Sequence, residues 1–179
     1  MSDFNNIFEN KIIYEKKFTV DLAVKSGYTI DYGAWHDRSA HDDWPIPWHL
    51  LSVTVTIDHD VLYQGPVDLA GLRLSHVMLD TDTTQSHSMT IAVSGFSSAH
   101  SFYHDGQEIN AQLMIEQFKI EHLDLLPLIS QEGHKIFTES SDANPGSHEL
   151  LRGNHAQVLH FSTPIYPWLL SKFSSINHS

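Results

Sequence analysis

The sequence contains no cysteine in its 179 residues. This absence excludes a disulfide framework, a thiolate nucleophile and a zinc site built on cysteine. Basic residues are scarce as well. Only 10 lysines and arginines stand against 22 aspartates and glutamates, and the formal net charge at pH 7 is −12. Because such a charge repels phosphate groups, we expect neither nucleic acid nor an anionic membrane surface as a partner.

Long apolar runs are also missing. The longest covers residues 123–129, is interrupted by polar and proline residues, and is too short to span a bilayer. The first residues lack the basic start and the apolar stretch of a signal peptide. We therefore expect a protein that is made in the cytoplasm, carries no signal peptide and does not insert into a membrane.

Sequence motifs of catalysis are absent too. Ser94 and Gly95 lack the Gly-x-Ser-x-Gly context of a hydrolase nucleophile, and the 9 glycines form no phosphate-binding G-x-G-x-x-G series. A carboxylate pair that cleaves a glycosidic bond is defined by its separation in space, so the sequence leaves that chemistry open. The missing motifs favour a protein that binds over one that catalyses.

What the sequence does contain is a repeated alternation of apolar and polar residues. Over residues 51–57, aliphatic side chains at every second position are separated by serine and threonine. Successive side chains of a strand point to opposite faces, so this pattern predicts sheets with one buried face. We expect an all-β fold, an antiparallel β-sandwich of about eight strands with little helix. The expected strands cover residues 12–24, 27–33, 50–57, 60–64, 72–79, 88–95, 109–121 and 156–163.

Several local features refine this prediction. We expect residues 1–11 to form a mostly polar arm and residues 12–179 to form a single sandwich domain. Residues 25–27, Lys-Ser-Gly, lie between two alternating runs and predict the tip of a hairpin. Alternation over residues 28–32 places Tyr32 on the same face as Tyr28.

The strand expected over 109–121 changes phase. Its apolar residues switch parity along the chain, so a β-bulge near residues 116–117 is needed to point all of them inward. The residues concerned are Leu113, Ile115, Phe118 and Ile120.

Residues 35–49 concentrate tryptophan, histidine and aspartate between stiffening prolines. A sugar ring is recognised by a flat apolar surface together with carboxylates that accept its hydroxyl protons, and tryptophan with aspartate supplies both. The sequence therefore predicts a ligand-binding loop, with a structural plug at one end of the sandwich as the alternative. We expect exposure for Trp44 and burial for Trp48. The predicted ligand-binding residues are Trp35, Asp42, Asp43, Trp44 and Trp48.

The same loop could instead hold a metal ion. His36 and His41 are five residues apart and Asp37 can supply an oxygen ligand, so these three form the predicted metal site. Aspartates elsewhere, as at Asp58–Asp60 and Asp80–Asp82, resemble halves of calcium-binding loops but lack their glycine and distal glutamate. A divalent cation such as calcium or zinc is the alternative to a protein without cofactor.

Parts of the chain resemble known protein classes. Residues 52–62 and 87–95 are similar to the jelly-roll pattern of carbohydrate-binding modules. Residues 161–170, Phe-Ser-Thr-Pro-Ile-Tyr-Pro-Trp-Leu-Leu, resemble the endings of small β-sandwich proteins of tailed bacteriophages. The resemblance implies a jelly-roll-like sandwich with an exposed aromatic patch and a place in a virion, and it assigns no individual binding residue.

These observations together predict a non-catalytic binding or structural module. We expect it to act in a virion or another assembly, as a homo-oligomer or beside other subunits, and to bind a glycan or a neighbouring subunit. The alternative is a metal-dependent β-sandwich or cupin-like enzyme that uses a histidine and aspartate site.

Overall fold

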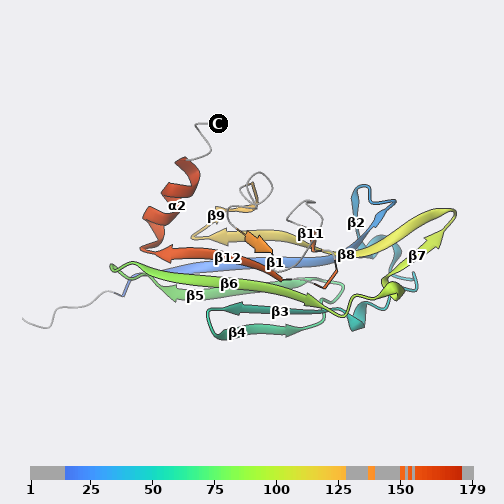
Figure 1. Cartoon of the computed structure of the whole chain (residues 1–179), viewed down its shortest axis with the longest axis horizontal. Coiled ribbons are helices and arrows are strands. Elements are labelled where there is room, and N and C mark those ends of the chain that lie inside the picture. Colours follow the sequence, from blue (N-terminus) through green and yellow to red (C-terminus); the bar gives the residue numbers. More distant parts are fainter. Residues whose placement is uncertain (1–14, 128–136, 140–149, 152, 155, 175–179) are drawn as a thin grey trace, which may run out of the picture.

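The computed structural model describes residues 15–127, 137–139, 150–151, 153–154 and 156–174. Within these residues the chain forms two antiparallel sheets, one of seven strands and one of five. The molecule is elongated, with its helix at one end and strands β2 and β7 at the other (Figure 1). The predicted all-β antiparallel sandwich is therefore confirmed. The predicted arm, residues 1–11, lies outside the described residues.

The larger sheet is built on two long central strands that the alternating pattern explains. Strand β1 pairs with β8 along most of its length, and the remaining strands add to the outer edges of these two. The members are β1 (Lys17–Ile30), β2 (Trp35–Asp37), β5 (Leu72–Leu79), β7 (Ser101–His104), β8 (Gln107–Ile120), β9 (Leu123–Asp124) and β11 (Leu150–Leu151).

Two predictions about β1 are wrong. No hairpin tip interrupts the strand at residues 25–27, because these residues pair continuously with β8. The strand instead ends at Ile30, so Tyr32 lies in the following turn and is 60% exposed instead of sharing the buried face of Tyr28. Serine and glycine are ordinary turn residues, but here Trp35 packs over Gly27 and a side chain at that position would not fit.

The predicted bulge is confirmed. Ala23 pairs with Gln117 and Val24 with Ile115, so Glu116 is the extra residue of β8. The four apolar residues on either side of it are all buried. The Glu116 carboxylate contacts Lys25 Nζ at 2.9 Å and Arg73 at 3.4 Å. The hydrogen bond from Lys25 and the negative charge of Glu116 raise the pKa of Lys25. The bulge thereby links β8 to both β1 and β5.

The smaller sheet has the order β10-β12-β6-β3-β4. Its central strands alternate between buried and less buried positions, as the sequence predicts, and in β3 the buried residues are all aliphatic. Helix α2 (Ile165–Ser174) follows β12 and covers one end of the core with Ile165, Trp168 and Leu169. The strands are β3 (Ser52–Ile57), β4 (Asp60–Gly65), β6 (Gln85–Ser94), β10 (Phe137–Glu139) and β12 (Ala156–Thr163).

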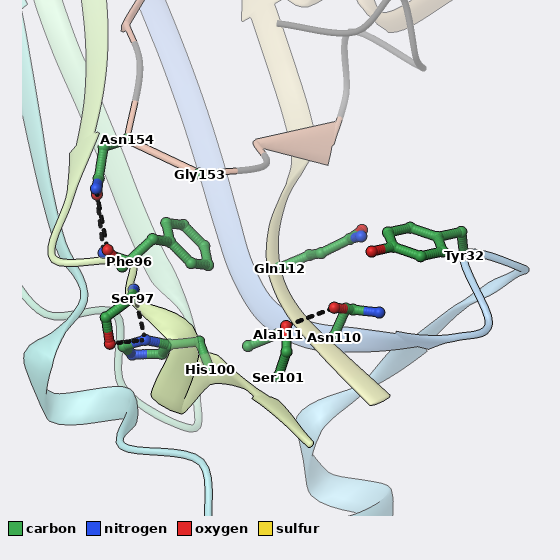
Figure 2. Close-up of a pocket in the computed structure, with 10 residues that line it drawn as sticks. All are labelled: Tyr32, Phe96, Ser97, His100, Ser101, Asn110, Ala111, Gln112, Gly153 and Asn154. Atoms are coloured by element: carbon green, nitrogen blue, oxygen red, sulfur yellow. Dashed lines mark hydrogen bonds between the residues drawn. The ribbon is translucent and has the colours of Figure 1, made fainter. Parts of the chain in front are cut away.

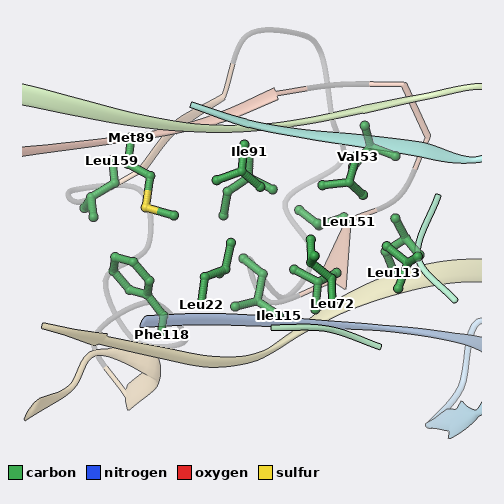
Figure 3. Packing of buried hydrophobic residues seen from close by; sticks show 14 of the residues in the cluster. Leu22, Val53, Leu72, Met89, Ile91, Leu113, Ile115, Phe118, Leu151 and Leu159 are labelled. Carbon is green, nitrogen blue, oxygen red and sulfur yellow. The ribbon is translucent and has the colours of Figure 1, made fainter. Parts of the chain in front are cut away.

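The core lies between the two sheets. Figure 3 shows Phe118, Leu22 and Ile115 of the larger sheet pointing toward Met89, Leu159 and Ile91 of the smaller one. Each of these side chains is at most 2% exposed. Burial on this scale is the main source of stability, because each fully buried aliphatic or aromatic side chain contributes about 1.5–3 kcal/mol. No helix of the described residues is long and apolar enough to cross a membrane.

The turn between β3 and β4 is held by an aspartate. Asp58 has a left-handed backbone (φ 52°), and its carboxylate accepts a hydrogen bond from the Ser88 amide at 2.9 Å and faces His87 Nδ1 at 2.8 Å. Partial burial acts to raise the pKa of Asp58, but the contacts with His87 and Ser88 outweigh it and the pKa is lowered.

A lowered folded-state pKa means that the Asp58 carboxylate stabilises the fold above about pH 4 and that this stabilisation is lost as the pH falls through the folded-state value. We therefore expect Asp58→Asn to lower the free energy of unfolding by about 1 kcal/mol at pH 7 and by less at pH 3. Urea unfolding at both pH values measures this difference. Asp60→Asn, at an exposed position of the same turn, is the control. An equal loss for Asp58→Asn at both pH values would contradict the prediction.

Candidate functional site

Residues 35–49, here called the tryptophan loop, close one end of the sandwich. Strand β2 pairs with β1, and the short helices η1 (Arg38–His41) and η2 (Trp48–Leu50) return the chain to β3. Trp35 lies flat over Gly27, where an added Cβ would be 2.3 Å from the indole ring. Trp35 and Trp44 are each half-buried. The loop is thus held against the sheet end by its own aromatic rings.

Trp44 is the centre of an aromatic cluster, which consists of Trp44, Tyr28, His41, Phe102 and His104. His41 stacks on the indole at 4.1 Å between ring centroids, nearly parallel, and Tyr28 and Phe102 pack at 4.8 and 5.5 Å. One face of the indole is therefore already covered. The expected exposure of Trp44 is not what the structure shows.

Trp48 and the acidic residues of the loop have separate roles. The ring of Trp48 is only 6% exposed and belongs to the core, as expected for a plug. Arg38 lies over that ring at 5.1 Å and donates to Asp42 at 2.7 Å, while Asp43 is exposed. The structure therefore does not gather the five predicted ligand-binding residues, Trp35, Asp42, Asp43, Trp44 and Trp48, around one open surface.

Each of the predicted metal ligands contacts other residues. His36 stacks on Tyr28 and His41 on Trp44, whereas Asp37 accepts from the Ser39 amide and lies 3.5 Å from Lys25. The Ser39 hydrogen bond and the lysine lower the pKa of Asp37. In the part of the chain that the structure describes, no three histidine, aspartate or glutamate side chains form a group that could hold a metal ion. The structure thus does not assemble His36, His41 and Asp37 into a site.

A pocket opens instead at a gap in the edge of β8. On the edge that faces away from β1, Asn110 pairs with β7 and Leu113 pairs with β11, so Ala111 and Gln112 lie in a two-residue gap between these ladders. The pocket at this gap has a volume of about 340 Å³, within the range of small-molecule sites. It is lined by Tyr32, Phe96, Ser97, His100, Ser101, Asn110, Ala111, Gln112, Gly153 and Asn154.

The pocket reaches both sides of the sheet edge. Three consecutive residues of β8 line it, and consecutive side chains of a strand point to opposite faces. In Figure 2, Asn110 and Gln112 extend toward Tyr32, whereas Ala111 points toward His100. A ligand in the pocket would therefore contact polar amides on one side of β8 and apolar groups on the other.

Tyr32 is presented to the pocket by an unusual turn. Asp31 and Tyr32 both adopt the left-handed backbone region, with φ of 49° and 57°. Two hydrogen bonds between Asp31 and Glu108 hold this conformation, at 2.8 Å and 2.7 Å. Strained residues of this kind concentrate at functional sites, where the surrounding structure maintains them. Here the result is an exposed tyrosine ring at the mouth of the pocket.

The opposite wall is fixed by hydrogen bonds. The Asn154 side chain accepts from the Phe96 amide at 2.8 Å and donates to the Phe96 carbonyl at 3.0 Å. His100 Nδ1 accepts from the Ser97 amide at 3.1 Å, and Nε2 lies 3.2 Å from the Pro47 carbonyl oxygen. In this arrangement His100 accepts through Nδ1 and can donate through Nε2. Since no lining residue is an aspartate, glutamate, lysine or arginine, the pocket has no net charge although the chain is strongly acidic.

Two side chains of the pocket have unused hydrogen-bonding capacity. Asn110 and Gln112 are 7% and 2% exposed, and among the described residues neither Asn110 Nδ2 nor Gln112 Oε1 has a hydrogen-bond partner. A buried polar atom without a partner costs about 1–3 kcal/mol, so native proteins rarely retain one without a function. These two atoms mark the most polar part of the site.

Sequence reasoning missed this pocket. Asn110 and Gln112 occupy outward positions of an alternating strand, where any polar residue is expected. Tyr32 falls in phase with Tyr28, and nothing in the spacing reveals that the strand ends between them. The available signal was the pair of amide residues two positions apart in a stretch, residues 109–115, that is otherwise apolar.

The comparisons with known proteins do not add a family. No protein family matches the chain, and neither the curated proteins nor the solved structures contain a match. The description of the site therefore depends on its geometry alone.

Proposed function

We propose that the protein is a non-catalytic β-sandwich binding module and that its ligand is a neutral glycan held in the pocket at the β8 edge. One observation carries the proposal. An uncharged pocket of about 340 Å³ brings an exposed tyrosine together with buried amide side chains that have hydrogen-bonding capacity to spare. Ligand sites typically combine such apolar contact with a few placed polar groups.

The chemistry of the pocket suits a sugar. A pyranose has an apolar face of ring hydrogens, which packs on an aromatic ring such as Tyr32, and a rim of hydroxyl groups that both donate and accept. Amide side chains can satisfy both functions of a hydroxyl, and a site without net charge does not favour an ionic ligand. Phe96 supplies a second apolar surface on the opposite wall.

The tryptophan loop supports the site without contacting the ligand. Trp44 packs edge to face on Phe102 of β7, and the neighbouring residue of β7, Ser101, lines the pocket. Ser101 donates to Asn110 Oδ1 at 2.5 Å. The aromatic cluster therefore positions β7, and β7 in turn orients the Asn110 amide.

Tyr32→Ala tests this proposal. Loss of an exposed ring that packs on a sugar removes about 1–2 kcal/mol of binding energy, so glycan affinity should fall about tenfold with little change in melting temperature. A glycan array identifies binders of the wild-type protein, and titration calorimetry then measures the affinity of the variant.

Tyr103→Ala is the matched control. Tyr103 is 75% exposed on β7 but does not line the pocket. The Tyr103→Ala variant should bind glycan as the wild type does. If the array shows no glycan binding, or if both tyrosine variants lose it equally, the proposal is wrong.

A further inference from the structure

The pocket contains one unused donor and one unused acceptor side by side. Asn110 Nδ2 can donate, Gln112 Oε1 can accept, and neither has a partner in the part of the chain that the structure describes. Their residues are two positions apart on β8 and therefore on the same face. Figure 2 shows both amide ends extending in the same direction, toward the Tyr32 ring.

The remaining atoms of both amides are already fixed. Asn110 Oδ1 accepts from Ser101, and Gln112 Nε2 donates to Thr29 Oγ1 at 3.1 Å. Thr29 is completely buried, so the orientation of Gln112 is set from within the sheet. Hence the site offers a ligand a preset pair of complementary groups, not two amides that can turn freely.

We propose that this pair recognises a secondary amide, and that the glycan bound in the pocket carries an acetamido group, as an N-acetylhexosamine does. The carbonyl oxygen of the acetamido group accepts from Asn110 Nδ2, and its N–H donates to Gln112 Oε1. A hydroxyl presents its donor and its acceptor on a single oxygen, whereas the acetamido group presents them on two separate atoms. The inference depends on the proposed glycan site and specifies its ligand.

Burial of the two amides explains why a narrow branch is the recognised part. Asn110 and Gln112 lie below the surface, whereas Tyr32 stands at the mouth. An acetamido group projects from the sugar ring and can reach inward while the ring itself packs on Tyr32. Discrimination is then expected to be large, because a ligand without the amide would leave at least one of the two buried groups unpaired.

The test compares two trisaccharides that differ at this position. Chitotriose carries an acetamido group at C2 of each ring, and cellotriose carries a hydroxyl there. We expect titration calorimetry on the full chain to give at least tenfold tighter binding of chitotriose.

Two double variants remove the amides without leaving new unpaired groups. Gln112→Met with Thr29→Val, and Asn110→Leu with Ser101→Ala, each replace both partners of a hydrogen bond with apolar groups, which is nearly neutral or stabilising. Melting temperatures should therefore be unchanged or higher. The two trisaccharides should then bind to the variants with about equal affinity. Gln107→Met, at an exposed position of the same strand outside the pocket, should keep the full preference.

The outcomes separate the two proposals. Equal affinity of the wild type for both trisaccharides overturns the acetamido inference and leaves a glycan module. A preference for chitotriose that survives in both folded double variants also overturns the inference, because another group must then read the amide. If neither trisaccharide nor any glycan of an array binds, both proposals fail.

Discussion

Trp44→Ala is expected to lower the free energy of unfolding by roughly 3 kcal/mol, at the lower end of the range for core tryptophan because the ring is half-buried. The variant removes the ring on which His41, Tyr28 and Phe102 pack, and the surrounding backbone of β1 and β7 cannot close the space. Urea unfolding monitored by circular dichroism measures the loss.

The same experiment decides what the tryptophan loop does. Tyr166→Ala, which removes a ring that is 57% exposed on α2, should cost less than about 0.5 kcal/mol and serves as the control. If Trp44→Ala were equally harmless, the loop would be an open platform and the plug interpretation would be wrong. A secondary loss of glycan affinity is expected, because β7 carries Ser101.

Gly95→Ala is expected to have the largest effect on the fold, with a loss of roughly 4 kcal/mol or more. Gly95 follows β6 and has a φ of 90°. It lies so close to the end of η2 that an added Cβ would be 1.9 Å from the Leu50 carbonyl oxygen. A backbone atom cannot move aside as the end of a flexible side chain can. We expect little soluble folded protein, or a melting temperature lowered by many degrees.

Gly106→Ala separates strain from steric clash. Gly106 also has a positive φ, 80°, but no atom lies within 4 Å of the position of its Cβ. Gly106→Ala should therefore lower the free energy of unfolding only by the energy of a left-handed backbone at alanine, about 1–2 kcal/mol. If the two variants lost the same stability, the close approach of Gly95 to Leu50 would not be the cause, and the placement of the adjoining pocket wall at Phe96 would need another explanation.

How much of this structure could be predicted depends on the range of the interactions. The bulge at Glu116 was predictable, because four apolar residues with two parities must all reach one core and only an extra residue allows this. The end of β1 was not predictable. Tyr32 continues the local alternation. The turn is stabilised by a hydrogen bond between Asp31 and Glu108, which lie 77 residues apart in the chain.

The tryptophan loop illustrates the same limit. Its composition indicated both a platform and a plug, and burial was expected for Trp48, which is flanked by Pro47 and Leu50. Apart from His41 of the same loop, the partners that cover Trp44 come from β1 and β7, so its exposure depended on contacts that no local pattern contains. Composition thus located an important loop and left its role open.

The sequence by itself determined the all-β class, most of the strands and the inward face of each, because period-two alternation is a local property of a chain that must bury one side of every strand. It also determined the acidic charge and the absence of thiol chemistry. Only the tertiary structure decided where a ligand could bind. The pocket exists because β7 and β11 leave two residues of β8 between them and because turns from distant parts of the chain bring Tyr32 and Phe96 to that gap.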